Sequence, residues 1–360
     1  MAGRRAAAEN TEAQATRRRA VLGRSMRLGA WSLLACAILL ELGLRLVLGN
    51  FAQSRLLQHS EDADVCLENR PSMEITYTGW LKRVPPTHMR TNSLGARGPE
   101  LAASVPAGAL RVAYLGDSFT FGQGVEEEEA FATVIGEQLA ARGVPVETLN
   151  FGVSGHGTPQ SIALLERQVV PLQPDVVVLN VFANDLSAED SYCLRGRNRG
   201  KRSYERWLLQ NVYLVRLGVI VTSPFRQVPQ VDDVAALGTP EERYRKAIAK
   251  GQALAEQHGF LFVVVLLTDA SMFTDSRHCQ GCAAPHALMT GSPVTTLDMS
   301  DSWRALQRDI DANFIAGEGH FTVAGNALMG AAIAERLQVS PAFQALSGGA
   351  AEPGPAVPGR

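Results

Sequence analysis

Four short groups of polar residues carry the side chains best suited to nucleophilic chemistry. The first, Gly116-Asp117-Ser118, directly follows the apolar run 110–115. A serine hydroxyl is a poor nucleophile until a base takes its proton, and a position at the end of a strand would present it to a substrate. Asp117 is the candidate supporting residue beside it. In the alternative interpretation, Asp117 and Ser118 only cap a turn.

Two more groups follow apolar runs further along the chain. Residues 150–155 read Asn-Phe-Gly-Val-Ser-Gly, and the glycine at Gly155 leaves a backbone N–H unhindered. Residues 182–185 read Phe-Ala-Asn-Asp, where the amide of Asn184 could donate a hydrogen bond to a developing oxyanion. Each of these groups, taken alone, is also typical of an ordinary turn after a strand.

The fourth group holds a histidine. Residues 318–325 read Glu-Gly-His-Phe-Thr-Val-Ala-Gly and precede an apolar pattern of helical period. A histidine at such a turn can act as general base toward a serine and then as general acid, and a nearby carboxylate would orient its ring. His320 is therefore the candidate base, unless it only caps a helix at the surface.

The segments that must position these groups alternate along the chain. Apolar runs predict strands at residues 110–115, 146–149, 176–182, 260–267 and 294–297. Helical spacing or helix-start signals predict helices around residues 131–139, from 158, over 240–258 and over 323–337. This alternation predicts an α/β fold with a parallel, doubly wound sheet, and the four groups would share its carboxyl edge.

The residue types and their order resemble the SGNH/GDSL hydrolase superfamily over about residues 110–337. The resemblance implies a three-layer α/β/α sandwich with a flavodoxin-like, five-stranded parallel sheet. It places the nucleophile on Ser118 and the base on His320. The oxyanion hole would consist of the N–H groups of Ser118 and Gly155 and the amide of Asn184. We expect no cofactor and no metal.

Two positions depart from the pattern of that superfamily. Phe182 stands where members often have glycine, and Gly317 stands where many have the aspartate that orients the histidine. Residues 318–322 resemble instead an Asp-x-His block found in alginate-type acetyl-transfer proteins, with glutamate for aspartate. We therefore expect Glu318 to complete the catalytic triad, with Asp309, Asp311 or a backbone carbonyl as alternatives.

The N-terminal region predicts a membrane anchor. Seven arginines and two glutamates occur in the first 27 residues, and the stretch from Leu28 to Phe51 is apolar except for Glu41 and Arg45. It is long enough to cross a bilayer as a helix. A cleaved signal peptide is the alternative, although no clean cleavage site follows it. Arginines before the span predict a single-pass protein of the inner membrane with a periplasmic catalytic domain.

We expect five parts: a disordered basic cytoplasmic tail (1–26), a transmembrane signal anchor (27–51), an extracytoplasmic wrapping segment (52–108), the hydrolase domain (109–340) and a flexible tail (341–360). Residues 186–240 form an insertion, either a lid over the site or a solvated loop without a substrate role. The net charge of −2 gives no reason to expect nucleic acid as a partner.

The cysteines agree with an oxidising compartment. Four of them lie beyond the apolar stretch and allow three pairings, of which we favour Cys66–Cys193 with Cys279–Cys282. A zinc site of Cys279 and Cys282 with His278 and His286 is the alternative for the second pair.

The expected chemistry is acyl transfer at an ester. We predict a serine ester hydrolase that removes acyl groups from extracytoplasmic glycan or lipid esters. One alternative is an O-acetyltransferase that modifies a cell-envelope polysaccharide together with partner machinery, which the Asp-x-His-like block and the anchor favour. The other is a non-catalytic envelope glycan-binding protein, which Gly317 keeps open. Release of free acid separates the first two, and turnover that depends on Ser118 separates both from the third.

Overall fold

The structure is a computed structural model of the 360-residue chain. It describes residues 2–47, 56–79, 84–102, 105–183, 185, 208, 212–222, 238–274 and 284–348. The chain divides into two units, residues 1–48 with 202–227 and residues 49–201 with 228–360. The second unit contains Ser118, Gly155, Glu318 and His320.

The larger unit is built on a parallel sheet. Its strands are β5 (Leu110–Gly116), β6 (Val146–Gly152), β7 (Val176–Val181), β8 (Leu261–Leu266) and β9 (Thr295–Asp298). All pairings are parallel, in the order β6-β5-β7-β8-β9. Along the chain this is the order 2-1-3-4-5, which confirms the flavodoxin-like prediction. Every residue of β7 is buried, as expected for a central strand covered on both faces.

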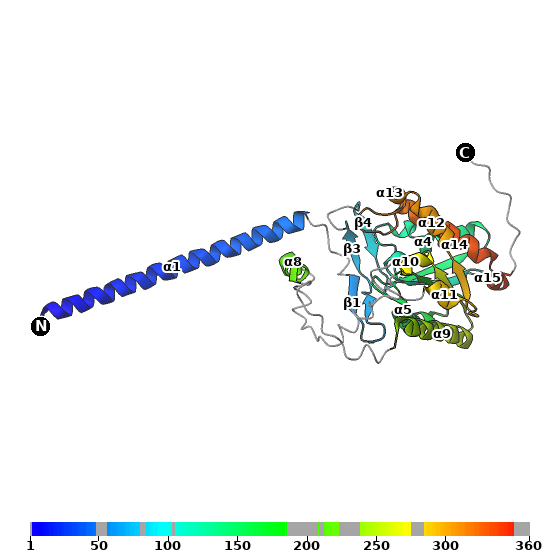
Figure 1. The fold of residues 1–360 in the computed structure, drawn as a ribbon, viewed down its shortest axis with the longest axis horizontal. Helices are drawn as coiled ribbons and strands as arrows, with labels where there is room; N and C mark the ends of the chain where they lie inside the picture. The colour runs from blue at the N-terminus through cyan, green and yellow to red at the C-terminus, as the bar shows by residue number, and fades with distance from the viewer. Residues whose placement is uncertain are drawn as a thin grey trace. The chain divides into compact units, whose positions relative to one another are not determined.

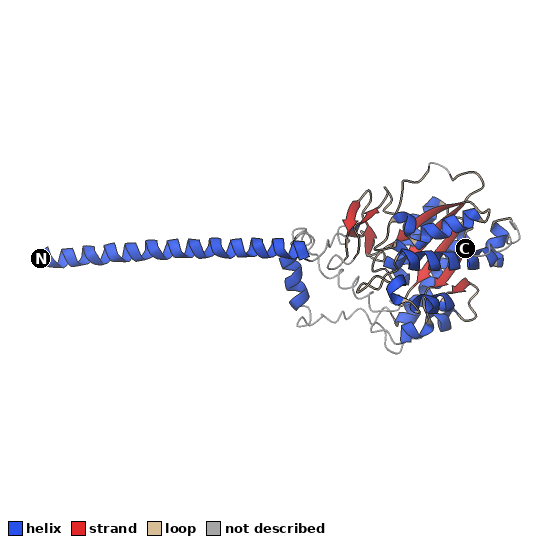
Figure 2. Ribbon diagram, turned by 90° about the horizontal axis from the view of Figure 1, so that it is seen from above, coloured by secondary structure: helices blue, strands red, loops and turns tan. Residues whose placement is uncertain are grey.

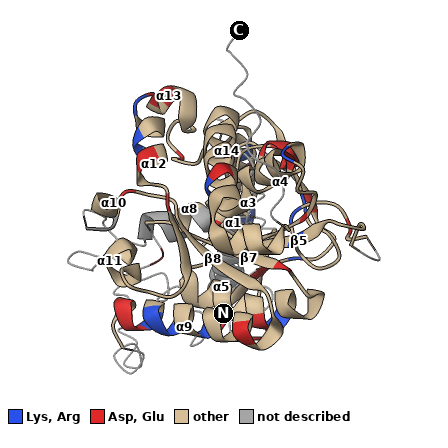
Figure 3. Cartoon of the chain, turned by 90° about the vertical axis from the view of Figure 1, so that its right-hand side faces the viewer, with Lys and Arg blue, Asp and Glu red and all other residues tan. Residues whose placement is uncertain are grey.

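Helices cover both faces of this sheet (Figure 1; Figure 2). One face carries α4 (Phe131–Ala141), α12 (Ser300–Gln307), α14 (Val323–Val339) and α15 (Pro341–Leu346), whose apolar side chains share one core. The other carries α5 (Thr158–Leu164), α9 (Pro240–His258) and α11 (Pro285–Met289) in a second core. None of the buried residues of α9 is charged, and its charged positions are coloured in Figure 3.

Helix α9 shows why some boundaries could be predicted. Thr239 and Glu242 form a capping box at its start, and Gly259 ends it in the left-handed conformation. Shorter helical segments complete the unit: α3 (Ser118–Phe121), η2 (Glu127–Glu129), η3 (Leu165–Val169), η4 (Val170–Leu172), α10 (Ala270–Thr274) and α13 (Ile310–Asn313).

The segment before the sheet forms two small antiparallel hairpins. Strand β1 (Leu57–His59) pairs with β2 (Leu67–Asn69), and β3 (Glu74–Tyr77) pairs with β4 (Thr87–Arg90). Buried side chains of the second hairpin, including Tyr77 and Met89, pack with Phe121 and Ile315 in a third apolar cluster. This segment therefore contacts the residues that follow Ser118 and precede His320.

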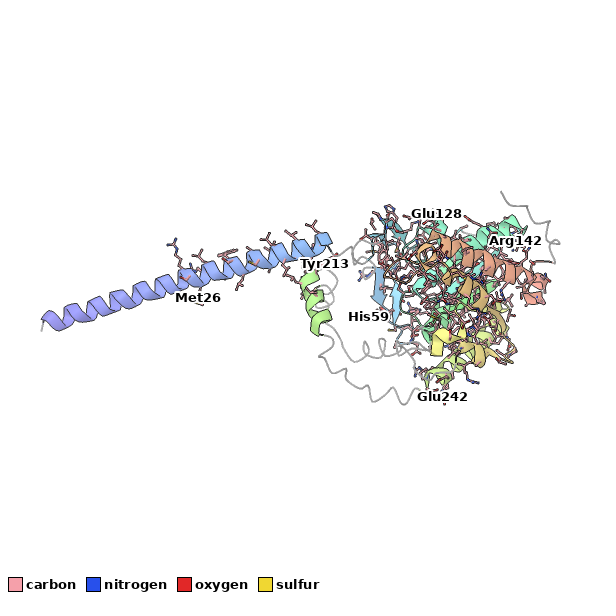
Figure 4. The ribbon with its side chains drawn as sticks, turned by 45° about the horizontal axis from the view of Figure 1, so that its top comes forward. Met26, His59, Glu128, Arg142, Tyr213 and Glu242 are labelled. Carbon is pink, nitrogen blue, oxygen red and sulfur yellow. The ribbon has the colours of Figure 1, made fainter. Side chains whose placement is uncertain are left out.

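The smaller unit contains α1 (Ala2–Val47) and α8 (Tyr213–Thr222). Residues 23–46 of α1, with a mean hydropathy of 1.6 and no burial, form a candidate membrane span. Met26 projects from it and Tyr213 lies beside it (Figure 4). Within the span, Glu41 pairs with Arg45 at 2.8 Å and accepts hydrogen bonds from the N–H groups of Tyr213 and Leu214. The partners of Glu41 offset the cost of a charge in an apolar segment.

The structure corrects two predictions of disorder. Residues 1–26 are expected to be a disordered tail, whereas α1 is helical from Ala2, because alanine, arginine and glutamate favour a helix. Residues 341–360 are expected to be flexible, whereas α15 begins with Pro341 and buries Phe343 fully in the core.

Several predictions lie outside the described residues. Of the insertion 186–240, the structure describes only Leu208, residues 212–222 and residues 238–240, so the lid stays a prediction. Both favoured disulfides include cysteines outside the described residues, as does the alternative zinc site, so these also stay predictions.

Candidate active site

Ser118 opens the short helix α3 at the carboxyl end of β5. Asp117 caps that helix and accepts a hydrogen bond from the Phe119 N–H at 2.9 Å. Gly116 makes the turn with a φ of 147°. A Cβ at Gly116 would collide with the Thr120 hydroxyl and lie 2.8 Å from the Asn180 carbonyl oxygen. The turn therefore requires glycine before Asp117, and it leaves Ser118 half-buried.

The end of β6 closes on the same turn. A Cβ at Gly152 would collide with the backbone nitrogen of Phe121 and lie 2.7 Å from the carbonyl carbon of Thr120. The Asn150 side chain donates to the Thr120 carbonyl oxygen at 2.8 Å and accepts from the Gly152 N–H at 3.0 Å. Asn150, which begins the predicted group 150–155, thus links that group by a hydrogen bond to the turn that contains Ser118.

Arg97 holds the far end of the Ser118 turn, and its role was not predicted from the sequence. Its guanidinium donates to the carbonyl oxygens of Phe121, Gly122 and Val125, and it lies 5.0 Å from the Phe121 ring centre. Burial lowers the pKa of Arg97 to about 10, and the glutamates at 126–129 oppose that shift, so the side chain is charged at neutral pH. No local pattern marks Arg97, because its partners are main-chain groups 24 to 28 residues away.

His320 reaches Ser118 from a distant part of the chain. Its Nε2 lies 2.8 Å from Ser118 Oγ, within hydrogen-bond distance. Its half-buried ring packs against Phe119, with ring centres 5.1 Å apart. Desolvation lowers the pKa of His320 to about 4. The ring is therefore neutral at pH 7 and can accept the Ser118 proton.

Glu318 has a different partner from the predicted one. Its Oε2 accepts a hydrogen bond from the Tyr77 hydroxyl at 2.7 Å. His320 Nδ1 is buried and has no hydrogen-bond partner among the described residues. Of the two alternative carboxylates, Asp309 accepts from the Ala312 N–H at the start of α13, and Asp311 is exposed. Among the described residues, the structure thus brings Ser118 and His320 together and places the Glu318 carboxylate against Tyr77, so the triad stays a prediction.

The predicted oxyanion donors are described only in part. Gly155 is exposed, with a φ of 84° and no atom within 4 Å of a Cβ built there. Asn184 lies outside the described residues. Its neighbour Asp185 accepts hydrogen bonds from the Phe182 N–H at 3.0 Å and the Thr158 hydroxyl at 2.7 Å. These bonds tie the turn after β7 to the start of α5, on the edge of the sheet where Gly155 lies.

Phe182, the second departure from the superfamily pattern, belongs to an aromatic cluster beside the Ser118–His320 pair. Its ring stacks on Phe119 with centres 3.9 Å apart and meets Trp303 edge-on at 5.6 Å. Phe321 packs against Phe119 on the same side, at 4.9 Å. This pair therefore has an aromatic wall on its histidine side. Among the described residues, no group of three or more His, Cys, Asp or Glu is placed to hold a metal.

Comparison with known protein families identifies the family of the region that contains Ser118 and His320. The sequence model of the GDSL-like lipase/acylhydrolase family matches residues 114–328, more than half of the 360-residue chain. No curated protein gives a significant match.

Several solved structures are similar at low identity. A lipase/acylhydrolase from Enterococcus faecalis is 16% identical, with 64% of this chain and 95% of that one covered and a TM-score of 0.39. A member of the lipolytic protein G-D-S-L family from Veillonella parvula is 16% identical, with 63% and 97% covered and a TM-score of 0.39. An acetylxylan esterase from Geobacillus stearothermophilus is 13% identical, with 63% and 94% covered and a TM-score of 0.38.

Proposed function

Because the chain belongs to the GDSL-like lipase/acylhydrolase family and is an ester-bond hydrolase, we propose that it is a serine esterase in which Ser118 and His320 act as a dyad. One observation supports this most directly: His320 Nε2 lies 2.8 Å from Ser118 Oγ. A neutral imidazole at that distance is the arrangement that general-base activation of a serine requires.

The reaction follows from this geometry. His320 takes the proton from Ser118 Oγ as the oxygen attacks the ester carbonyl carbon, and a tetrahedral intermediate forms. The N–H groups of Ser118 and Gly155 and the amide of Asn184 donate hydrogen bonds to its oxyanion, each worth about 3 kcal/mol of transition-state stabilisation. His320 then protonates the leaving alcohol. Water, deprotonated by His320, attacks the acyl-enzyme, and the acid leaves as the Ser118 hydroxyl is restored.

The proposed substrates are acylated glycans or lipids outside the cytoplasm. The candidate span at residues 23–46 would hold the catalytic unit at the inner membrane, and the arginines before it favour a periplasmic catalytic unit. Cysteine pairs beyond the span would form in that compartment. At this position the enzyme would act on envelope esters, alone or beside the machinery that handles envelope polysaccharides.

The test is hydrolysis of p-nitrophenyl acetate by the full-length chain in detergent. We expect Ser118→Ala to reduce the rate to background. The matched control is Ser161→Ala, because the buried Ser161 hydroxyl has no hydrogen-bond partner among the described residues. Equal rates for wild type and Ser118→Ala would contradict the proposal.

The same reaction separates hydrolysis from transfer. A hydrolase releases acetate in equal amount to p-nitrophenol. If less acetate appears, and acetyl groups are found on an added polysaccharide, the protein is an O-acetyltransferase.

A further inference from the structure

The loop that carries His320 is short and closed on itself. The Ile315 N–H donates to the His320 carbonyl oxygen at 2.7 Å, and the Gly319 N–H donates to the Ile315 carbonyl oxygen at 3.0 Å. Gly317 and Gly319 both have left-handed φ values, 75° and 78°, which glycine adopts without strain. Glu318 lies between these glycines, two residues before His320, so a restraint on its side chain also restrains the histidine backbone.

A buried hydroxyl provides that restraint. Tyr77, the last residue of β3, is 5% exposed and donates to Glu318 Oε2 at 2.7 Å. Burial and the Glu318 carboxylate raise the pKa of Tyr77, so its hydroxyl keeps its proton. The backbone at Gly79 lies against the same carboxylate, since a Cβ there would collide with Glu318 Oε1. Tyr77 and Gly79 thus both lie against the Glu318 carboxylate.

The same hydroxyl also contacts the nucleophile loop. Gln123 Nε2 donates to the Tyr77 hydroxyl oxygen at 2.8 Å. The backbone N–H of Gln123 donates to the Ser118 carbonyl oxygen at 3.1 Å. Together with the bond between His320 and Ser118, these contacts close a ring that runs through Ser118, Gln123, Tyr77, Glu318 and His320.

We propose that Tyr77 is a positioning residue that couples the His320 loop to the Ser118 loop. In a full triad a carboxylate on Nδ1 holds the imidazole in place. Here Nδ1 has no described partner, so the backbone of the loop must orient the ring, and Tyr77 fixes that backbone through Glu318. Tyr77 lies outside residues 114–328, the range that the family model matches. This inference rests on the proposed esterase function.

The first test compares Tyr77→Phe with Tyr114→Phe. Both changes remove one buried hydroxyl, but that of Tyr114, in β5, has no hydrogen-bond partner among the described residues. We expect Tyr77→Phe to lower kcat by about 10-fold to 100-fold and to leave KM within about twofold. Tyr114→Phe should leave both constants within about twofold. Equal kinetics in the two variants would overturn the proposal.

The second test separates a loop anchor from a triad acid. The side-chain oxygen of glutamine can still accept the Tyr77 hydrogen bond, so Glu318→Gln should retain most of the activity that Glu318→Ala loses. If Glu318 instead oriented His320 as a triad acid, Glu318→Gln would lose on the order of 10⁴-fold in kcat. That outcome would overturn the proposal.

A third measurement does not depend on activity. Hydrogen exchange followed by mass spectrometry reports the opening of backbone amides. We expect Tyr77→Phe to speed exchange in peptides that cover residues 314–321 and 118–125, whereas Tyr114→Phe should not. Unchanged exchange in those peptides would overturn the role of Tyr77 even if the esterase proposal holds. Faster exchange in a protein without esterase activity would overturn the proposed function alone.

Discussion

The loops that carry Ser118 and His320 are held in place by different means. The Ser118 turn packs against other backbone at Gly116 and Gly152, and the buried Arg97 side chain donates to three of its carbonyl oxygens. The His320 loop is restrained by its own backbone hydrogen bonds and by the contact of the Glu318 side chain with Tyr77, and it is open around Gly319. The Ser118 turn thus depends on close packing and on one buried arginine, whereas the His320 loop has open space beside it and fewer contacts with the rest of the fold. Changes near Ser118 should therefore affect stability more than changes near His320.

The largest effect is expected for Arg97→Met, which leaves three carbonyl oxygens of the nucleophile turn without their donor. The free energy of unfolding should fall by about 4 kcal/mol, because each buried carbonyl oxygen that loses its donor costs about 1 to 3 kcal/mol. Urea denaturation measures it. Arg90→Met is the matched control, because Arg90 is 57% exposed and pairs with Glu127 at the surface. Its change should be about 0.5 kcal/mol. Similar losses in both variants would contradict the role of Arg97.

Gly152→Ala tests the contact between the two backbones. The added methyl group would collide with Phe121 N, which cannot move without shifting Ser118. We expect a loss of about 3 kcal/mol in unfolding free energy, together with reduced kcat. Thermal unfolding and ester hydrolysis, measured on the same sample, report both quantities. A variant with wild-type stability would show that the nucleophile turn is not closely packed.

Gly319→Ala is the corresponding change in the histidine loop. Nothing lies within 4 Å of the added Cβ, so the only cost is a left-handed φ of 78°. The unfolding free energy should fall by about 1 kcal/mol. If this loss equals that of Gly152→Ala in the same denaturation experiment, the two loops do not differ as we describe.

The smallest effect is expected for a change of pH near neutrality, where kcat/KM should stay level. Only neutral His320 can accept a proton, and desolvation lowers its pKa to about 4. The value of kcat/KM should therefore rise with pH, reach half its maximum near pH 4 and stay level through pH 7. Initial rates between pH 3.5 and 8 measure this. A midpoint well above 6.5 would indicate a carboxylate at Nδ1.

Acid stability needs a separate control in that experiment. His156 is buried against the Leu67 carbonyl oxygen, and burial lowers its pKa also to about 4. Because the unfolded chain takes up protons from about pH 6.5 downward and the folded chain does not, stability falls as the pH drops from about 6.5 toward 4. Circular dichroism at each pH separates unfolding from titration of the catalytic base.

The sheet was predictable because its signals are local. Runs such as 176–182 are apolar without alternation, which is typical of strands covered on both faces, and the groups with Ser118 and Gly155 directly follow such runs. The hairpins at residues 57–90 were not predicted, since strands of three or four residues are too short to show a period.

The partner of Glu318 could not be predicted from local sequence. A carboxylate two residues before a histidine can accept a hydrogen bond from that histidine or from any other donor nearby. Tyr77 decides between them, and it lies 241 residues away in the sequence. The partners of Arg97 could not be predicted either. Its guanidinium donates to main-chain oxygens, which every residue type carries.

The position of Tyr77 and Arg97 also has an evolutionary consequence. Both precede the family-matched region 114–328, yet they bind the loops of the nucleophile and the base. A gene fusion that transferred only residues 110–340 would carry Ser118 and His320 without the side chains that hold their loops. A transferred segment that keeps both contacts must therefore also contain the second hairpin and Arg97.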